Sequence, residues 1–143
     1  MHRFEAVSVV TGTVAGIDEA YGVTTIAHPA GSIVVPGRLP RVGASVRVTV
    51  RATEVTLSRE RGTATSVRTA LAGRIEAVTT DGGPFALVTV LLDGGETLYA
   101  YVTRLGFDAL GVAVGDRISA LIKAVSIDER GLAGLEAPEK RKA

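Results

Sequence analysis

Hydrophobic and polar residues alternate along most of this chain, which is the periodicity of β-strands. The pattern predicts strands at 7–17, 22–27, 32–35 and 44–57, and again at 70–79, 86–92, 96–103 and 117–127. Two Gly-containing segments, DGGP at 81–84 and DGG at 93–95, are typical of tight hairpin turns. One short helix is predicted inside TRLGFDALG, ended by Gly111.

The two halves of the chain resemble each other. VTGTVAGI aligns with LAGRIEAV, and RVGASVRVTVRA aligns with AVGDRISALIKA, so that Arg51 takes the place of Lys123. A repeat of about 60–65 residues predicts two copies of one unit. We therefore expect an all-β fold of two tandem five-strand OB-like barrels that share strands or pack tightly, with one short helix in the second. The predicted domains are a first, degenerate repeat at 1–62, a second repeat at 63–130 and a flexible tail at 131–143.

Composition restricts the function. The 143 residues carry a formal net charge of +1, no Cys, no Trp, three Phe and three Tyr. The absence of Cys excludes disulfides, thiol catalysis and Cys-zinc sites, and no apolar run is long enough to span a membrane. His2 and His28 lie far apart and suggest neither a metal site nor a His–carboxylate dyad. We expect a cytoplasmic protein that is not an enzyme, with no inserted membrane segment and no nucleic-acid partner.

Polar residues of the second repeat form a candidate binding site. Ser66 and Arg68 precede its first strand, spaced to point to one side of an extended segment, and Lys123 lies in an apolar strand. Thr103 occupies the N-cap position of the short helix, with the free N–H groups of residues 104–106 behind it. All of these groups can donate hydrogen bonds, and the set contains no carboxylate.

A donor-only site with two positive charges suits a doubly charged oxyanion. Hydrogen phosphate carries a proton near neutral pH and needs an acceptor, which this set does not offer. Sulfate, molybdate and tungstate need only donors. The first repeat has Glu5 and Val7 where the second has Ser66 and Arg68, so only the second carries this set.

These residues carry a family resemblance. SVRTALAG, YVTRLGFDALG, VG and LIKAV, in this order, resemble the molybdate-binding Mop domain (molbindin-like, TOBE superfamily) across almost all of the second repeat. The first repeat looks like the degenerate first half of a di-Mop domain. Such a pair is typical of the C-terminal regulatory domain of the ATP-binding subunit of molybdate ABC importers. Related units occur in molybdate-responsive transcription regulators and in stand-alone storage molbindins.

The resemblance implies that the chain binds molybdate or tungstate at a subunit interface. The implied ligands are Ser66, Val67, Arg68, Lys123 and Ala124 from one chain, with Thr103 and Gly106 from its partner. It also implies a homodimer or higher homo-oligomer in the cytoplasm. An ABC ATPase domain and a membrane permease would place it at the inner membrane as a peripheral component. Thr69 stands where the family usually has Asn, and Gly106 where some relatives have Ser.

Alternative interpretations stay open at this point. The chain could be a stand-alone molybdate storage molbindin, an OB-like nucleic-acid-binding barrel or a purely structural dimerisation module. Arg68 could be an ordinary solvated charge, Lys123 an edge-strand lysine and Thr103 only a helix cap. The sequence does not separate molybdate from tungstate.

Overall fold

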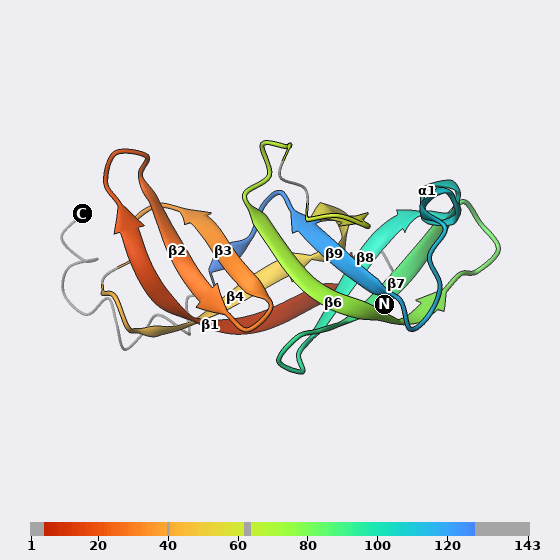
Figure 1. The fold of residues 1–143 in the computed structure, drawn as a ribbon, viewed down its shortest axis with the longest axis horizontal. Coiled ribbons are helices and arrows are strands. Elements are labelled where there is room, and N and C mark those ends of the chain that lie inside the picture. The colour runs from red at the N-terminus through yellow and green to blue at the C-terminus, as the bar shows by residue number, and fades with distance from the viewer. Residues whose placement is uncertain (1–4, 40, 62–63, 128–143) are drawn as a thin grey trace.

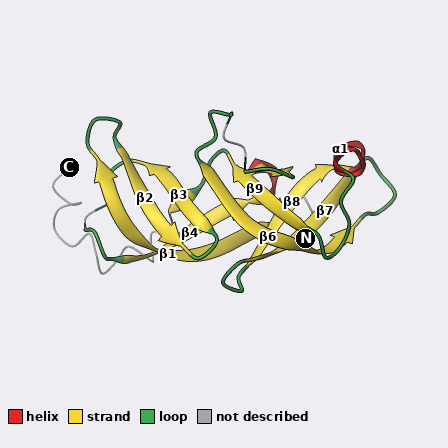
Figure 2. Cartoon of the chain, in the orientation of Figure 1, coloured by secondary structure: helices red, strands yellow, loops and turns green. Residues whose placement is uncertain are grey.

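Two five-stranded antiparallel sheets form the protein (Figure 1, Figure 2). The computed structural model describes residues 5–39, 41–61 and 64–127. The first sheet has the order β10-β4-β1-β2-β3, with β1 Val7–Asp18, β2 Val23–His28, β3 Gly31–Pro36, β4 Ser45–Arg51 and β10 Ser126–Ile127. The second has the order β5-β9-β6-β7-β8, with β5 Val55–Ser58, β6 Thr69–Thr79, β7 Phe85–Leu92, β8 Thr97–Thr103 and β9 Arg117–Ile122. The expected all-β architecture is confirmed.

Each sheet contains one strand from the other half of the chain. β5 pairs with β9 in the second sheet, and β10 pairs with β4 in the first. The expected continuous strands at 44–57 and 117–127 are therefore wrong: a short 3-10 helix at Ala52–Glu54 interrupts the first, and residues 123–125 interrupt the second. At each break the chain leaves one sheet for the other. The predicted boundary between residues 62 and 63, and the predicted tail at 131–143, lie outside the described residues.

The internal repeat is visible in the backbone. The register of β1 shifts between Val14 and Gly16, and that of β6 shifts between Ile75 and Ala77, the positions that the sequence repeat aligns. The repeated glycines have the same role. A Cβ at Gly12 would come within 2.7 Å of a backbone oxygen of β2, and one at Gly73 within 2.5 Å of a backbone oxygen of β7. Only glycine lets each long strand pass so close to its neighbour.

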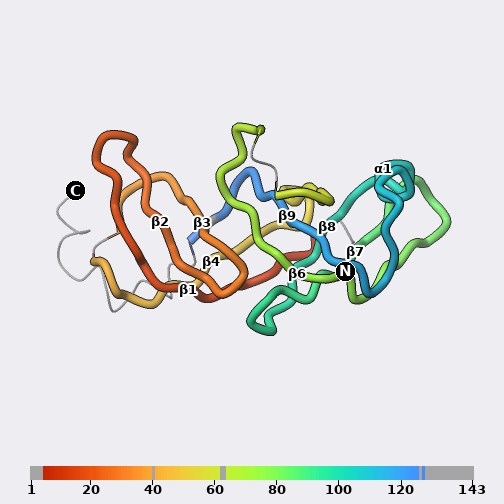
Figure 3. Tube along the Cα trace, viewed as in Figure 1, coloured from red at the N-terminus to blue at the C-terminus, as the bar shows by residue number. Residues whose placement is uncertain are grey.

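One hydrophobic core spans both halves. The inward side chains of the two sheets form a single buried cluster, in which Val10, Val48, Leu71 and Val88 are fully buried. The tube in Figure 3 shows the resulting elongated molecule, with the hairpin β2–β3 towards one end and α1 (Arg104–Leu110) at the other. Within the described residues, no helix is long and apolar enough to cross a membrane.

Candidate functional site

A pocket of about 290 Å³ lies where β6 begins and β9 ends. The second half contributes the predicted donors, and β2 and β3 of the first half contribute an apolar wall. The lining residues are Val23, Val34, Pro36, Ser66, Val67, Arg68, Thr69, Ile122 and Lys123. The structure thus brings together four of the predicted site residues, and none of the described residues lining the pocket is acidic.

The segment that carries Ser66 and Arg68 is a bend held by its own hydrogen bonds. The Thr65 hydroxyl accepts from the Val67 amide at 2.7 Å. The Arg68 guanidinium donates to the Thr65 carbonyl oxygen at 2.6 Å and to the Val67 carbonyl oxygen at 3.2 Å. The expected extended conformation is wrong here, because the chain bends at Thr65 and Ser66 before β6 begins. Two donors of Arg68 fix the loop, which leaves its remaining N–H groups for a ligand.

Lys123 is the first residue after β9, at the point where the chain crosses between the sheets. Its amide donates to the Glu54 carbonyl oxygen at 3.1 Å, which ties this crossing to the equivalent crossing of the first half. Its side chain is exposed at the pocket. Because Thr69 of β6 pairs with Ile122 of β9, Lys123 lies beside the Ser66–Arg68 bend, and its ammonium group adds a positive charge to the same pocket.

Thr103 caps the predicted helix. Its hydroxyl accepts from the Gly106 amide at 2.9 Å, and the helix ends at Gly111, a left-handed C-cap with φ of 69°. The helix and its cap are confirmed. The expectation of free N–H groups at residues 104–106 is wrong for two of them, because Arg104 donates to the Pro84 carbonyl oxygen at 2.8 Å and Gly106 donates to Thr103. The Thr103 hydroxyl keeps its own proton for donation.

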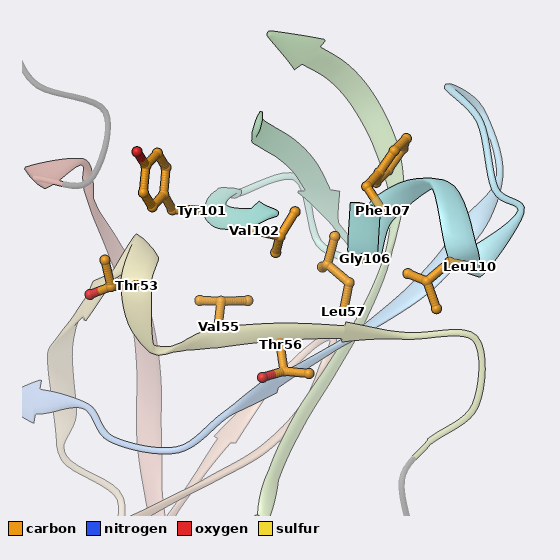
Figure 4. Close-up of a pocket in the computed structure, with 9 residues that line it drawn as sticks. All are labelled: Thr53, Val55, Thr56, Leu57, Tyr101, Val102, Gly106, Phe107 and Leu110. Carbon is orange, nitrogen blue, oxygen red and sulfur yellow. The ribbon is translucent and has the colours of Figure 1, made fainter. Parts of the chain in front are cut away.

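Thr103 and Gly106 lie away from the Ser66 pocket of their own chain. Figures 1 and 3 show α1 at one end of the molecule and the segment entering β6 near the middle. Gly106 lines a different, mostly apolar pocket of about 340 Å³ between α1, β5 and β8 (Figure 4). Phe107 and Leu110 of the helix line this pocket together with Val55 and Leu57 of β5. A single chain does not join the two groups of predicted ligands.

Ala124 lines a third pocket, next to the crossing of the first half. This pocket of about 170 Å³ is lined by Thr49, Arg51, Glu54, Ala124 and Val125. Arg51, the counterpart of Lys123 in the repeat, is therefore also at a pocket. Glu54 adds an acidic residue, so this counterpart is not a donor-only site.

The structure contains a His–carboxylate pair that the sequence did not indicate. His28 Nε2 lies 2.7 Å from a carboxylate oxygen of Glu96, and the His28 side chain is 1% exposed. His28 Nδ1 accepts from the Ala30 amide at 3.0 Å. Because that bond requires an unprotonated Nδ1, Nε2 carries the hydrogen and donates it to Glu96. Both ring nitrogens are engaged, so His28 has no free nitrogen for catalysis. Because His28 belongs to the first half and Glu96 to the second, the pair joins the two halves.

These features define a class: a duplicated, strand-exchanged β-protein with a donor-only pocket in its second half. Residues 65–128 match the TOBE domain family. The chain is 37% identical over 130 residues to the molybdenum import ATP-binding protein ModC of Rhodobacter capsulatus, covering 89% of this chain and 36% of that protein. It is 35% identical over 126 residues to ModC of Mesorhizobium japonicum, covering 88% and 34%.

The fold of this chain matches a solved structure over nearly the whole length of that structure. The cytoplasmic molybdate-binding protein ModG, with molybdate bound, superposes with a TM-score of 0.70 at 30% sequence identity, covering 83% of this chain and 93% of that one. The chain belongs to the TOBE domain family. It spans about a third of the length of the ModC proteins that it matches, 36% and 34%, and it corresponds to a TOBE domain rather than to an ATPase domain.

Proposed function

We propose that this chain binds molybdate or tungstate, and that the pocket of Ser66, Val67, Arg68 and Lys123 is the chain's own part of the binding site. The observation that carries the proposal is the chemistry of this pocket: it presents a hydroxyl, a guanidinium and an ammonium group, and its described lining includes no acidic residue. Molybdate bound to ModG, a relative that this chain matches over 93% of its length, supports the same ligand.

The pocket distinguishes anions by their protons. A fully deprotonated dianion accepts hydrogen bonds from every donor and balances the charges of Arg68 and Lys123. Hydrogen phosphate must also donate one bond, whereas the guanidinium and ammonium groups only donate and Val23, Val34 and Pro36 are apolar. If the Ser66 hydroxyl accepts the phosphate proton, it no longer donates to the anion through that contact, so the set loses one donor. Phosphate is therefore disfavoured.

A second copy of the chain completes the site. Thr103 and Gly106 belong to the cap and first turn of α1, which lies at one end of the molecule, whereas the segment that enters β6 lies near the middle (Figure 1). In this proposal they therefore serve the pocket of a partner in a homodimer or higher homo-oligomer. Thr103 would donate its hydroxyl hydrogen, while the Gly106 amide stays on Thr103 and Gly106 contributes close backbone approach. Ala124, which lines the adjacent pocket, would contribute its backbone at the rim.

The physiological setting that we propose is regulation of a molybdate ABC importer. The identity to ModC proteins over 89% and 88% of this chain supports it. The domain would then act in the cytoplasm beside an ABC ATPase domain and a membrane permease, as a peripheral component. A stand-alone storage protein is the second candidate, favoured by the 93% coverage of ModG. The intact mass of the endogenous polypeptide separates the two, because only a regulatory domain is fused to an ATPase.

Calorimetric titration tests the binding site. We expect wild-type protein to bind molybdate and tungstate far more tightly than phosphate. Arg68→Ala should lose charge-assisted hydrogen bonds of about 1.5–3 kcal/mol, which is roughly a ten- to hundredfold loss of affinity. Arg117→Ala is the matched control, because Arg117 is an arginine of the same half that pairs with Asp93 outside this pocket. Equal binding of phosphate, or unchanged affinity in Arg68→Ala, would refute the proposal.

A further inference from the structure

A buried hydroxyl ties the binding-site segment to the other half of the molecule. Thr69 follows Arg68 directly and is 3% exposed. Its Oγ1 accepts a hydrogen bond from the amide of Val34 in β3 at 3.0 Å. Val34 and Thr69 both line the Ser66 pocket. This bond therefore connects the first residue of β6 to the strand that forms the apolar wall of the pocket.

The first half contains the same device at the equivalent position. In the sequence repeat Ser8 aligns with Thr69, one residue after Val7, the counterpart of Arg68. Ser8 is 4% exposed, and its Oγ accepts from the amide of Tyr99 in β8 at 2.9 Å. In each half, a buried hydroxyl near the start of the long strand thus accepts a hydrogen bond from a backbone amide of the opposite half. Only the Thr69 bond lies at the candidate site.

The Thr69 bond lies directly after the Ser66–Arg68 bend. The bend is held by its own hydrogen bonds, because Thr65 accepts from both the Val67 amide and the Arg68 guanidinium. The residue that follows the bend, Thr69, makes the hydrogen bond to the apolar wall. We propose that Thr69 is a positioning residue of the oxyanion site, and that through it the first half of the chain sets the affinity of the second. This inference rests on the proposed function.

The two hydroxyls provide a matched pair of variants. Thr69→Val keeps the shape of the side chain and removes the acceptor, whereas Thr69→Ser keeps the acceptor. Ser8→Ala removes the equivalent hydroxyl far from the pocket. We expect Thr69→Val and Ser8→Ala to lower the free energy of unfolding by similar amounts, since each leaves a part-buried amide without its acceptor. Only Thr69→Val should weaken molybdate binding, by about five- to tenfold, with Thr69→Ser within about twofold of wild type.

Titration calorimetry with sodium molybdate, alongside urea unfolding of the same four proteins, separates the outcomes. If wild type does not bind molybdate, the proposed function fails. If wild type binds and Thr69→Val binds equally well, the proposed function stands and the positioning role is refuted. An equal loss of affinity in Ser8→Ala, or no rescue by Thr69→Ser, would also overturn it, because the effect would then follow from stability alone.

Hydrogen exchange on the wild-type protein decides the matter if Thr69→Val does not fold. Coupling between two sites is reciprocal, so an anion whose affinity depends on the Thr69 bond must in turn stabilise that bond. Molybdate should slow exchange of the Val34 amide and leave the Tyr99 amide unchanged, at a protein concentration where the assembly state does not vary. Equal exchange of Val34 with and without molybdate would refute the inference.

Discussion

Replacement of Glu96 should lower the free energy of unfolding more than replacement of a carboxylate on the exposed surface. Glu96 lies just before β8, yet its carboxylate accepts hydrogen bonds from two residues of the first half. These are the Thr11 amide, at 3.1 Å to the nearer oxygen, and His28 Nε2, at 2.7 Å. Both cross between the sheets. Glu96→Ala removes the acceptor from both partners, and the loss of stability differs strongly between the two hydrogen bonds.

The magnitude follows from the burial of each partner. The Thr11 amide is exposed, so water replaces the carboxylate and the cost is about 0.5 kcal/mol. The His28 side chain is 1% exposed, so its Nε2–H loses a charged acceptor and stays unpaired, at about 1.5–3 kcal/mol. We expect a total loss of about 2–3 kcal/mol, equivalent to a fall in melting temperature of roughly 5–10 °C. Glu96→Gln should lose about half as much, because an amide oxygen can still accept from His28.

Urea unfolding followed by circular dichroism measures this loss, at one protein concentration and without oxyanion, because ligand and assembly shift apparent stability. Glu19→Ala is the control. Glu19 pairs with Arg38 at 2.9 Å, but the two side chains are 69% and 63% exposed, so this pair should contribute about 0–0.5 kcal/mol. If Glu96→Ala is no more destabilising than Glu19→Ala, the joining role of the His28–Glu96 pair is refuted.

Two further predictions concern the surface and the assembly. Arg117 donates to both oxygens of Asp93, at 2.8 and 2.9 Å, and holds the pKa of Asp93 below its usual range. A carboxylate whose pKa is lowered on folding stabilises the folded state at pH values above its unfolded pKa, and this stabilisation is lost as the pH falls through its folded pKa. Asp93→Asn should therefore flatten the pH dependence of the free energy of unfolding below about pH 4. An unchanged slope would contradict this prediction. Because the proposed site is shared between two chains, molybdate should tighten self-association. Thr103→Val should cost about 1 kcal/mol of helix-cap stabilisation and should abolish this tightening. Sedimentation with and without molybdate checks the second effect, and a monomer that binds one anion with undiminished affinity would exclude a shared site.

The strands were predictable because most of them are half-buried and alternate. The repeat also predicted two units that share strands or pack tightly, but it did not predict which strands are exchanged or where the chain crosses between the sheets. Alternation continues through Arg51 and through Lys123, so the sequence pattern shows no interruption where the chain changes sheets. The breaks are set by tertiary structure, since Val55 pairs with Ile122 of the other half rather than continuing beside β1. The turn glycines and the cap at Thr103 are local features, and these were predicted correctly.

The candidate site was predictable in composition and less so in conformation. Ser66, Arg68 and Lys123 share a pocket, as their donor chemistry suggested. The bend at Thr65 was not predicted, because a backbone–guanidinium contact leaves no periodic signal in the sequence. The same is true of His28 and Glu96, which are far apart in the chain and are brought together only by the packing of the halves.

The strand exchange gives the first half a structural role, although its sequence lacks the donor set of the second half. The first half lacks the donors, with Glu5 and Val7 in place of Ser66 and Arg68 and with Glu54 at its counterpart pocket. It nevertheless supplies β5 to the second sheet, so its removal would leave β9 with an unpaired edge. It also supplies the apolar wall of the pocket and the Val34 amide, which donates a hydrogen bond to Thr69. The first half is thus part of the structure that holds the donors in place, although it does not carry the donor set itself.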